Sequence, residues 1–518
     1  MTGSPRGPST PTGPSTLSGP SATGGPDRSG PEGVLHELDA VEERGPGPDP
    51  GDRTGSRTGV DEGGRSQASR LESLARESYR LVLGEDGRCY AVDVDGPAVA
   101  VPLRGRDGLR SRLARSYYAR TGTAPAASAL VDALTVVEGM TAGTRPVPVG
   151  LRVARYGPDV VLDLGDPTGR AVVVGAGTWA VVECSPVLFR RTALTHALPV
   201  PHPCGTGGLG LLRGLLNVDE TGFALIVAWL VAALVPDIPH PILTLTGEQG
   251  TAKSTAARFL VSLIDPSPAP LRSAPRDVRA WAVTAAASWT VALDNISSIP
   301  AWLSDTLCKA VTGDGIVDRA LFTDDDVTVL SFRRALVLTW IDAGALAGDL
   351  AERLVCVDLH RIDPADRQPD QILEAAYRRA RPQILAALLD LLADVLAALP
   401  AIAPDELPRM ADFARILAAL DHVTGTRTLA AYTAASRDVT DAVLDADAVV
   451  CALREHLRTR PGGWTGTAAQ LLEMLTPEPA RRGFPRTPRA LSGSCGVWHR
   501  PCAPPASTSS SPRPNATG

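Results

Sequence analysis

Residues 242–263 read ILTLTGEQGTAKSTAARFLVSL, and this stretch decides the fold that the sequence predicts. Ile242–Leu245 is a short apolar run typical of a buried strand, and Thr255–Leu263 has the spacing of a helix. A strand, a glycine loop, a Lys-Ser pair and a helix in this order predict a phosphate-binding loop. Backbone N–H groups and the positive end of the helix dipole face phosphate oxygens in such a loop. The residues expected to bind are Gly247, Glu248, Gln249, Gly250, Thr251, Ala252, Lys253, Ser254 and Thr255.

The loop departs from the strict pattern at Ala252, which stands where a glycine usually precedes the lysine. We expect this alanine to cost little as long as its φ stays below zero. Lys and Arg together number 51, yet only Lys253 and Lys309 are lysines. Lys253 holds the position that reaches the β- and γ-phosphates, and the Ser254 hydroxyl is expected to contact Mg²⁺. The sequence therefore predicts ATP and Mg²⁺ as ligands, against the alternative of a chance glycine pattern near a lysine.

A carboxylate follows the next apolar strand, Trp289–Leu293, which ends in Asp294 and Asn295. A carboxylate at the carboxyl end of a strand beside the phosphate-loop strand suits a second contact to Mg²⁺. The alternative is a strand that simply ends in a polar turn. Many ATPases place a second acid here to polarise the attacking water, but Asn295 can only orient a water. Hydrolysis is therefore expected to be slow, or to use a base from elsewhere, such as Asp314 or Asp305.

Four further patterns follow along the chain. Leu303–Val311 has helical spacing, and the runs Val317–Phe322 and Val327–Phe332 alternate about an acidic tip, which predicts a β-hairpin. Leu336–Thr339 reads as another core strand. Arg353 then precedes the strand Leu354–Leu359. The acidic tip is Asp324–Asp326.

This order of motifs resembles the superfamily 3 helicases, and among them the poxvirus- and phage-type primase-helicases. The runs GEQGTAKS, AVTGDG and RMADFARILAALD (Arg409–Asp421) look closer still to ATP-binding proteins of actinobacterial phages and integrative elements. The resemblance extends from about residue 70 to residue 493. It implies an α/β P-loop NTPase core of the AAA+ and superfamily 3 helicase type, with an α+β N-terminal domain, a helical C-terminal region and a truncated winged-helix-like end.

The resemblance also implies roles for individual residues. Asp294 would be the Mg²⁺-binding acid, and Thr339 would lie near the sensor position, where these helicases usually carry Asn. Arg353 resembles an arginine finger that acts on a neighbouring subunit, which implies a homo-oligomeric ring; the alternative is a surface helix charge. The hairpin would face DNA, although its acidic tip is unfavourable next to phosphate.

Composition divides the chain into six parts. Residues 1–68 are rich in Pro, Gly and Ser and are expected to be disordered. The remaining parts are an α+β domain at 70–200, the ATPase core at 209–365, a helical region at 370–445, a winged-helix-like region at 446–493 and an aberrant tail at 494–518. A frameshift near Ser494 is one expected origin of that tail.

Net charge and apolar runs limit the partners and the location. The net charge is −6, so contact with DNA must come from a local basic patch. Phe223–Val235 falls short of the ~20 residues that span a bilayer, so we expect a buried helix, no membrane and a cytoplasmic protein. The eight cysteines are scattered, and Cys495, His499 and Cys502 lack a fourth zinc ligand.

Three functions remain open on the sequence. The first is a DNA-dependent ATPase or helicase-like motor of a phage or integrative element. The second is an ATP-binding switch or scaffold with little hydrolysis, which Asn295 favours. The third is a small-molecule kinase, which is disfavoured because the chain shows no lid or acceptor site.

Overall fold

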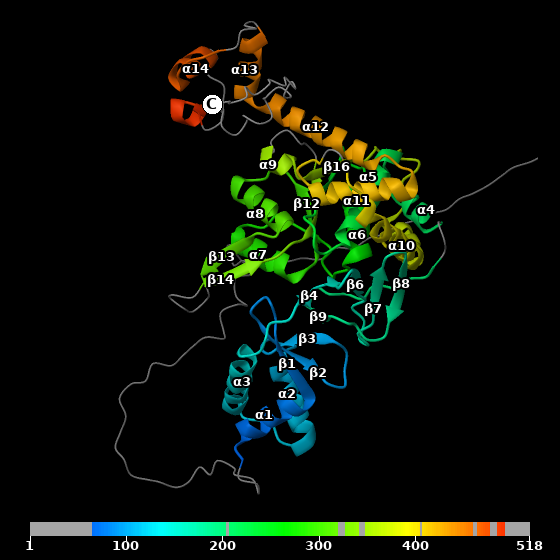
Figure 1. Cartoon of the computed structure of the whole chain (residues 1–518), viewed down its shortest axis with the longest axis vertical. Coiled ribbons are helices and arrows are strands. Elements are labelled where there is room, and N and C mark those ends of the chain that lie inside the picture. Colours follow the sequence, from blue (N-terminus) through cyan, green and yellow to red (C-terminus); the bar gives the residue numbers. More distant parts are fainter. Residues whose placement is uncertain are drawn as a thin grey trace, which may run out of the picture. The chain divides into compact units, whose positions relative to one another are not determined.

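The computed structural model describes residues 65–203, 207–319, 327–340, 348–404, 407–458, 464–476 and 484–492. These residues form a mixed α/β structure with a parallel sheet and a helical C-terminal region (Figure 1). Two further sheets precede the parallel one along the chain.

The first N-terminal sheet has its strands in the order β1-β2-β3-β9-β4. Its strands are β1 (Tyr79–Leu83), β2 (Cys89–Asp93), β3 (Val99–Pro102), β9 (Leu188–Arg190) and β4 (Val149–Gly150). Strands β1 and β2 form a hairpin, pairing antiparallel with Tyr79 opposite Asp93. The accompanying helices are α1 (Gln67–Ser78), α2 (Leu109–Thr121) and α3 (Ala127–Ala142), and they share a buried cluster of their own.

Helix α1 corrects the first predicted boundary, because it begins inside the segment 1–68 that was expected to lack structure. The Ser66 hydroxyl accepts a hydrogen bond from the backbone N–H of Ser69 at 3.1 Å and caps the helix. Leu71 and Leu74 are buried, so an apolar face stabilises a segment whose overall composition is polar.

The second N-terminal sheet is an antiparallel meander with the order β5-β6-β7-β8. Its strands are β5 (Val153–Tyr156), β6 (Asp159–Asp163), β7 (Ala171–Gly175) and β8 (Thr178–Val182). Val160, Leu162 and Val172 belong to the same buried cluster as the parallel sheet, not to the cluster under α1–α3. The segment 70–200 is therefore not the single small domain that we expected. Strand periodicity shows which side chains are buried, but not which neighbouring layer buries them.

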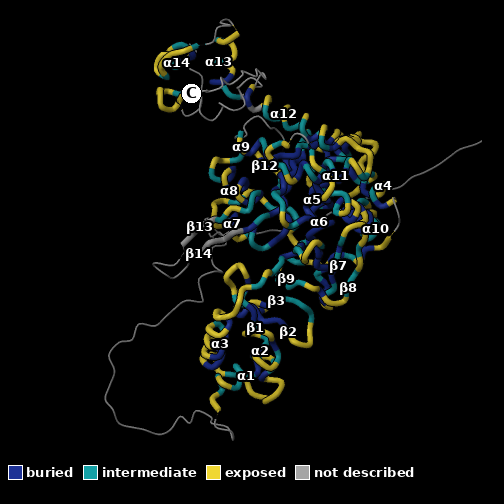
Figure 2. Tube along the Cα trace, viewed as in Figure 1, coloured by how far each residue is buried: buried dark blue, intermediate teal, exposed yellow. Residues whose placement is uncertain are grey.

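The parallel sheet has the order β11-β12-β15-β10-β16, and every neighbouring pair is parallel. Its strands are β11 (Leu271–Arg272), β12 (Thr290–Ile296), β15 (Ala335–Trp340), β10 (Ile242–Thr246) and β16 (Leu354–Asp358). All residues of β15 are buried. Figure 2 shows the dark buried segments of this part of the chain gathered around β12, α5 and α6. The associated helices are α4 (Gly207–Arg213), α5 (Glu220–Ala233), α6 (Lys253–Ile264), α7 (Val278–Ala287), α8 (Ala301–Thr312) and α9 (Gly348–Ala351).

The sheet order corrects one expectation, because β12 does not lie beside the phosphate-loop strand β10. Strand β15 lies between them and pairs with both. Chain order alone does not fix strand order, since a crossover connection can pass over a neighbouring strand. The expected hairpin is confirmed by the antiparallel pairing of β13 (Gly315–Arg319) with β14 (Val327–Ser331), while its predicted tip at 324–326 lies outside the described residues.

The C-terminal region is helical, as expected. It contains α10 (Asp370–Ala398), the short 3₁₀ helix η1 (Leu399–Ala401), α11 (Ala411–Thr424) and α12 (Thr428–Ala446). Within the described ranges, the segment 370–401 is the one helical span long and apolar enough to cross a membrane, and 56% of its most apolar window is buried inside the protein. Helix α10 contacts α4, α5, β7 and β8, and Trp179 donates a hydrogen bond to Asp390 at 2.7 Å. We therefore interpret α10 as a core helix.

The last described part contains α13 (Ala448–Arg458) and α14 (Ala468–Leu475). Thr467 and Gln470 form a capping box at the start of α14. A small buried cluster comprises Val449, Leu471, Leu475, Phe484 and Leu491. The described residues between 448 and 492 contain no strand, so the wing that a winged helix requires is not among them.

A buried ion pair joins the N-terminal β-meander to the parallel-sheet region. Arg152 is 0% exposed, and its Nε lies 2.9 Å from Asp265 Oδ1, at the end of α6. The two terminal guanidinium nitrogens of Arg152 donate hydrogen bonds to the backbone carbonyls of Asp163 and His196. The other Asp265 oxygen accepts from the Trp289 N–H at 2.7 Å. Both charges are therefore satisfied, as a buried pair requires.

Replacing Arg152 with Ala should destabilise the protein by about 3–5 kcal/mol, because the Asp265 charge stays buried without its partner. Denaturant unfolding of the purified chain measures this change. Arg155→Ala is the control, since Arg155 pairs with Asp237 at a part-exposed site and should cost under ~1 kcal/mol. Equal losses in the two variants would contradict this account of the pair.

Candidate functional site

The loop between β10 and α6 contains two glycines with positive φ. Gly247 has φ 135° and Gly250 has φ 86°, both in the region that favours glycine. A Cβ added to Gly247 would lie 2.6 Å from the carbonyl oxygen of Leu359, so no side chain fits there. Helix α6 begins at Lys253 without a side-chain cap, which leaves its first N–H groups free to bind an anion.

Ala252 does not keep the negative φ that we expected. Its φ is 62° and its ψ is 29°, which is the left-handed region. An L-residue with a Cβ costs roughly 1–2 kcal/mol in this conformation. The loop therefore requires the backbone shape that glycine adopts most easily, and Ala252 adopts that shape under strain.

The Lys253 ammonium group lies against the loop. Its Nζ donates to the carbonyl oxygens of Gly247 at 2.6 Å and Glu248 at 2.7 Å. Partial burial lowers the pKa of Lys253 below its ordinary value, and the carboxylates of Asp358 and Asp294 partly offset this effect. Both carbonyl bonds can be exchanged for stronger charge-assisted bonds to phosphate oxygens.

Asp294 links three elements of the site. Its Oδ1 accepts a hydrogen bond from the Ser254 hydroxyl at 2.8 Å and another from the Thr339 hydroxyl at 2.5 Å. Thr339 belongs to β15, the strand that separates β12, which carries Asp294, from β10, which leads into the loop. Its hydroxyl group therefore comes from the strand between Asp294 and the loop. The structure thus brings together Ser254, Asp294 and Thr339, three of the residues expected at the site, although the strand order differs from the expected one.

Asn295 joins this group through its backbone. Its N–H donates to the Thr339 hydroxyl oxygen at 2.8 Å, and its φ is 56°. The strand register shifts between Leu293 and Ile296, so a bulge lies where the polar residues follow the apolar strand. Asn295 and Ala252 are the two described non-glycine residues with positive φ, and both lie in this site.

Sequence reasoning missed the residues that β16 and its following loop bring to the site. Asp358 ends β16, and its Oδ1 accepts from the Thr246 hydroxyl at 3.2 Å, on the opposite side of the loop from Asp294. Arg361 lies 4.0 Å from Glu248, and a Cβ built on Gly250 would lie 3.5 Å from an Arg367 nitrogen. The sequence signal that could have identified Asp358 is an acid near the carboxyl end of the predicted strand Leu354–Leu359.

Arg353 is neither a surface charge nor extended toward solvent. It is 9% exposed, and its Nη1 lies 2.6 Å from the carboxylate of Asp349, one turn earlier. Arg409, which the sequence placed only within a resembling run, is more exposed and bridges Asp349 and Glu352 at 2.5 Å each. Arg353 therefore lies in an ionic cluster of its own subunit in this conformation.

The two alternative bases make no hydrogen bond with the Ser254–Asp294–Thr339 group. Asp314 accepts from the Thr312 hydroxyl at 2.9 Å within its own turn, and Asp305 lies on the exposed face of α8. Within the described part of the chain, no group of three or more His, Cys, Asp or Glu side chains could hold a metal. Cys495, His499 and Cys502 lie outside that part.

Two family models match the part of the chain that contains this site and the part that follows it. Residues 209–442 match the family described as the actinomycete integrative conjugative element replication protein, and residues 449–495 match the AICE RepA C-terminal domain. Together these matches span more than half of the chain. The chain belongs to the AICE RepA replication protein family. No curated protein matches the chain.

Solved structures of helicases are similar to this AICE RepA chain at low identity. The SCCmec type IV Cch active helicase is 12% identical over 75% of this chain and 79% of that chain, with a TM-score of 0.40. The apo NrS-1 C terminal region is 11% identical over 63% and 70%, with a TM-score of 0.34. JCV helicase, with a bound thiazolopyridine acetamide, is 14% identical over 46% and 73%, with a TM-score of 0.22.

Ala252→Gly should remove the left-handed strain and leave the protein equally stable or up to ~1 kcal/mol more stable. Ala256→Gly is the control, because Ala256 lies inside the right-handed helix α6. Glycine in a helix interior should lower the free energy of unfolding by about 1 kcal/mol. Denaturant unfolding of both variants measures the difference. A loss of stability in Ala252→Gly as large as that in Ala256→Gly would contradict the strained conformation.

Proposed function

We propose that this replication protein binds ATP and Mg²⁺ at the β10–α6 loop and works as a DNA-dependent, helicase-like ATPase of its integrative element. The carrying observation is the meeting of Lys253, Ser254 and Asp294 at the carboxyl ends of parallel strands. Ligands of open parallel sheets bind outside the carboxyl ends of the strands. On this proposal the sheet is an α/β P-loop NTPase core of the AAA+ and superfamily 3 helicase type.

Each residue has a definite task in the proposed site. The loop N–H groups and the start of α6 bind the phosphates, and Lys253 neutralises their charge. The Ser254 hydroxyl and the Asp294 carboxylate are hard oxygen donors of the kind that Mg²⁺ prefers, and their separation of 2.8 Å allows both to face one ion. Bound Mg²⁺ supplies charge neutralisation between phosphates. Thr339 holds the Asp294 carboxylate in place.

The alternative is a nucleotide switch with little hydrolysis, and Asn295 favours it. An amide follows Asp294 where a second acid would activate water, and its backbone is fixed by Thr339. Two carboxylates, Asp358 and Asp294, act electrostatically on the Lys253 ammonium group. Efficient hydrolysis would require Asp358 or a group from another subunit to take the proton from water.

The oligomeric part of the proposal is a ring in which Arg353 acts on the nucleotide of a neighbouring subunit. Arg353 would have to exchange its ion pair with Asp349 for that contact, and Arg409 could then hold Asp349 alone. A replication protein acting on element DNA works in the cytoplasm, and we include DNA and this location in the proposal.

Lys253→Ala should lower ATP turnover by about 100-fold or more, because the phosphates lose their main cationic partner. Phosphate release by the purified full chain, with and without single-stranded DNA, measures this. Lys309→Ala is the matched control, since it removes the other lysine, which is exposed on α8.

The same assay separates the two candidate functions. Wild-type turnover that rises with single-stranded DNA supports the motor. Tight ATP binding with turnover that DNA does not raise supports the switch. Equal ATP binding together with equal turnover in Lys253→Ala and wild type would remove both.

Mixing two inactive variants tests the ring. Lys253→Ala and Arg353→Ala proteins should each hydrolyse ATP poorly, and an equimolar mixture should regain a measurable fraction of activity because some interfaces combine an intact loop with an intact Arg353. Thermal unfolding of Arg353→Ala serves as the folding control. A stable Arg353→Ala protein that restores no activity on mixing would argue against an arginine acting in trans.

A further inference from the structure

The N-terminal part of the chain has a strongly basic segment in a protein of net charge −6. The loop 103–108 and helix α2 (Leu109–Thr121) contain one acidic residue, Asp107, and six arginines. The arginines are Arg104, Arg106, Arg110, Arg112, Arg115 and Arg120. The phosphate-loop site uses none of them.

Packing of α2 leaves Arg110, Arg112 and Arg115 outside its buried stripe. Leu109, Leu113 and Tyr117 recur every four residues and are buried against the N-terminal core. The opposite face therefore points to solvent, and it carries Arg115 and Tyr118, which is 59% exposed.

Two of the six arginines are already neutralised. Arg104 makes two hydrogen bonds to the carboxylate of Glu138, and Arg120 lies 3.2 Å from Glu77. The remaining four form no ion pair with any residue that the structure describes; they are Arg106, Arg110, Arg112 and Arg115. Their charge is therefore available to a partner.

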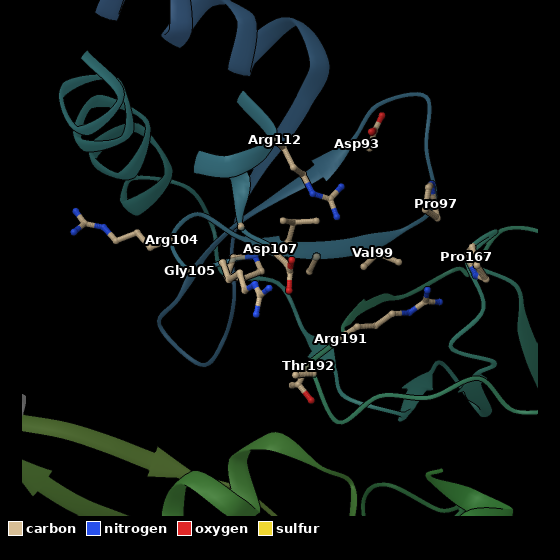
Figure 3. A pocket seen from close by; sticks show the side chains of 16 residues that line it. Asp93, Pro97, Val99, Arg104, Gly105, Asp107, Arg112, Pro167, Arg191 and Thr192 are labelled. Atoms are coloured by element: carbon tan, nitrogen blue, oxygen red, sulfur yellow. The ribbon is translucent and has the colours of Figure 1, made fainter. Parts of the chain in front are cut away.

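Two cavities flank this segment and meet at the loop. One of about 610 Å³ is lined by Arg106, Asp107 and Arg112 among others, and Figure 3 shows Arg112 and Asp107 directed into it while Arg104 points away. The other, of about 460 Å³, is lined by Arg106, Arg110 and Ser111, with no acidic residue in its lining. Arg191 also lines the first cavity, but Asp163 already binds its guanidinium at 2.7 Å.

We propose that the loop 103–108 and the arginines Arg110, Arg112 and Arg115 of α2 bind the phosphodiester backbone of DNA. We call this surface the α2 basic face. Guanidinium groups bind phosphate oxygens through two parallel hydrogen bonds, and unpaired arginines spaced along a helix suit a chain of phosphates. DNA is the favoured polyanion because the chain belongs to a replication protein family. Tyr118 is the one exposed aromatic residue of α2, so contacts to the backbone predominate over base stacking.

This site is separate from the ATP site and does not rest on the proposed hydrolysis. Binding is therefore measured without nucleotide, so that a failure of the ATPase proposal leaves the result readable. The protein is the full chain, and the probes are fluorescent duplex and single-stranded oligonucleotides of the same sequence, titrated at several salt concentrations.

Arg110→Ala/Arg115→Ala should weaken binding about tenfold and reduce the slope of log Kd against log salt by about 2, since each lost phosphate contact removes about one unit. Arg76→Ala/Arg120→Ala is the matched control. It also removes two exposed arginines from α1 and α2, but both are ion-paired, to Glu72 and Glu77. The duplex and single-stranded arms show which form of DNA the α2 basic face takes.

Arg110→Lys/Arg115→Lys keeps the charge and should keep the salt slope, which separates electrostatic binding from a folding defect. The proposal is overturned if Arg110→Ala/Arg115→Ala matches the control in both Kd and salt slope on both oligonucleotides. It is equally overturned if the lysine variant loses as much slope as the alanine variant.

Discussion

The parallel pairing of β10 with β15 and β16, and of β15 with β12, is the constraint on which the candidate site depends. It places the carboxyl ends of four strands at one edge of the sheet, and each contributes a polar group there. Asp294 then accepts hydrogen bonds from Ser254 and Thr339 on one side, while Asp358 meets Thr246 on the other. Lys253 lies between two carboxylates because of this register, and not because of its local sequence.

Helix α6 is held at both ends. Its first residue belongs to the loop, and its last turn leads into Asp265, which accepts from Arg152 and from the backbone of the strand β12 region. The N-terminal β-meander is therefore bonded to the far end of the helix whose start forms the candidate site. The buried cluster shared by β6, β7 and the parallel sheet makes the same connection through apolar contacts.

Backbone strain is concentrated where the chemistry is proposed. Ala252 and Asn295 are the described non-glycine residues with positive φ, and they are the chain neighbours of Lys253 and Asp294. Strained residues persist only where surrounding contacts hold them, and they gather at functional sites. Here the Asn295 conformation is held by Thr339, so one hydroxyl fixes both the carboxylate and the bulge beside it.

The sequence by itself determined the elements that depend on local pattern. The strand, loop and helix at 242–263 and the hairpin β13–β14 follow from residue spacing and turn residues. Only the tertiary structure decided that β15 separates β12 from β10, that Ala252 is left-handed, that Arg353 is buried against Asp349, and that Asp358 belongs to the site. These features depend on contacts between residues far apart in the chain, and periodicity carries information about which face is buried but none about the partner that buries it.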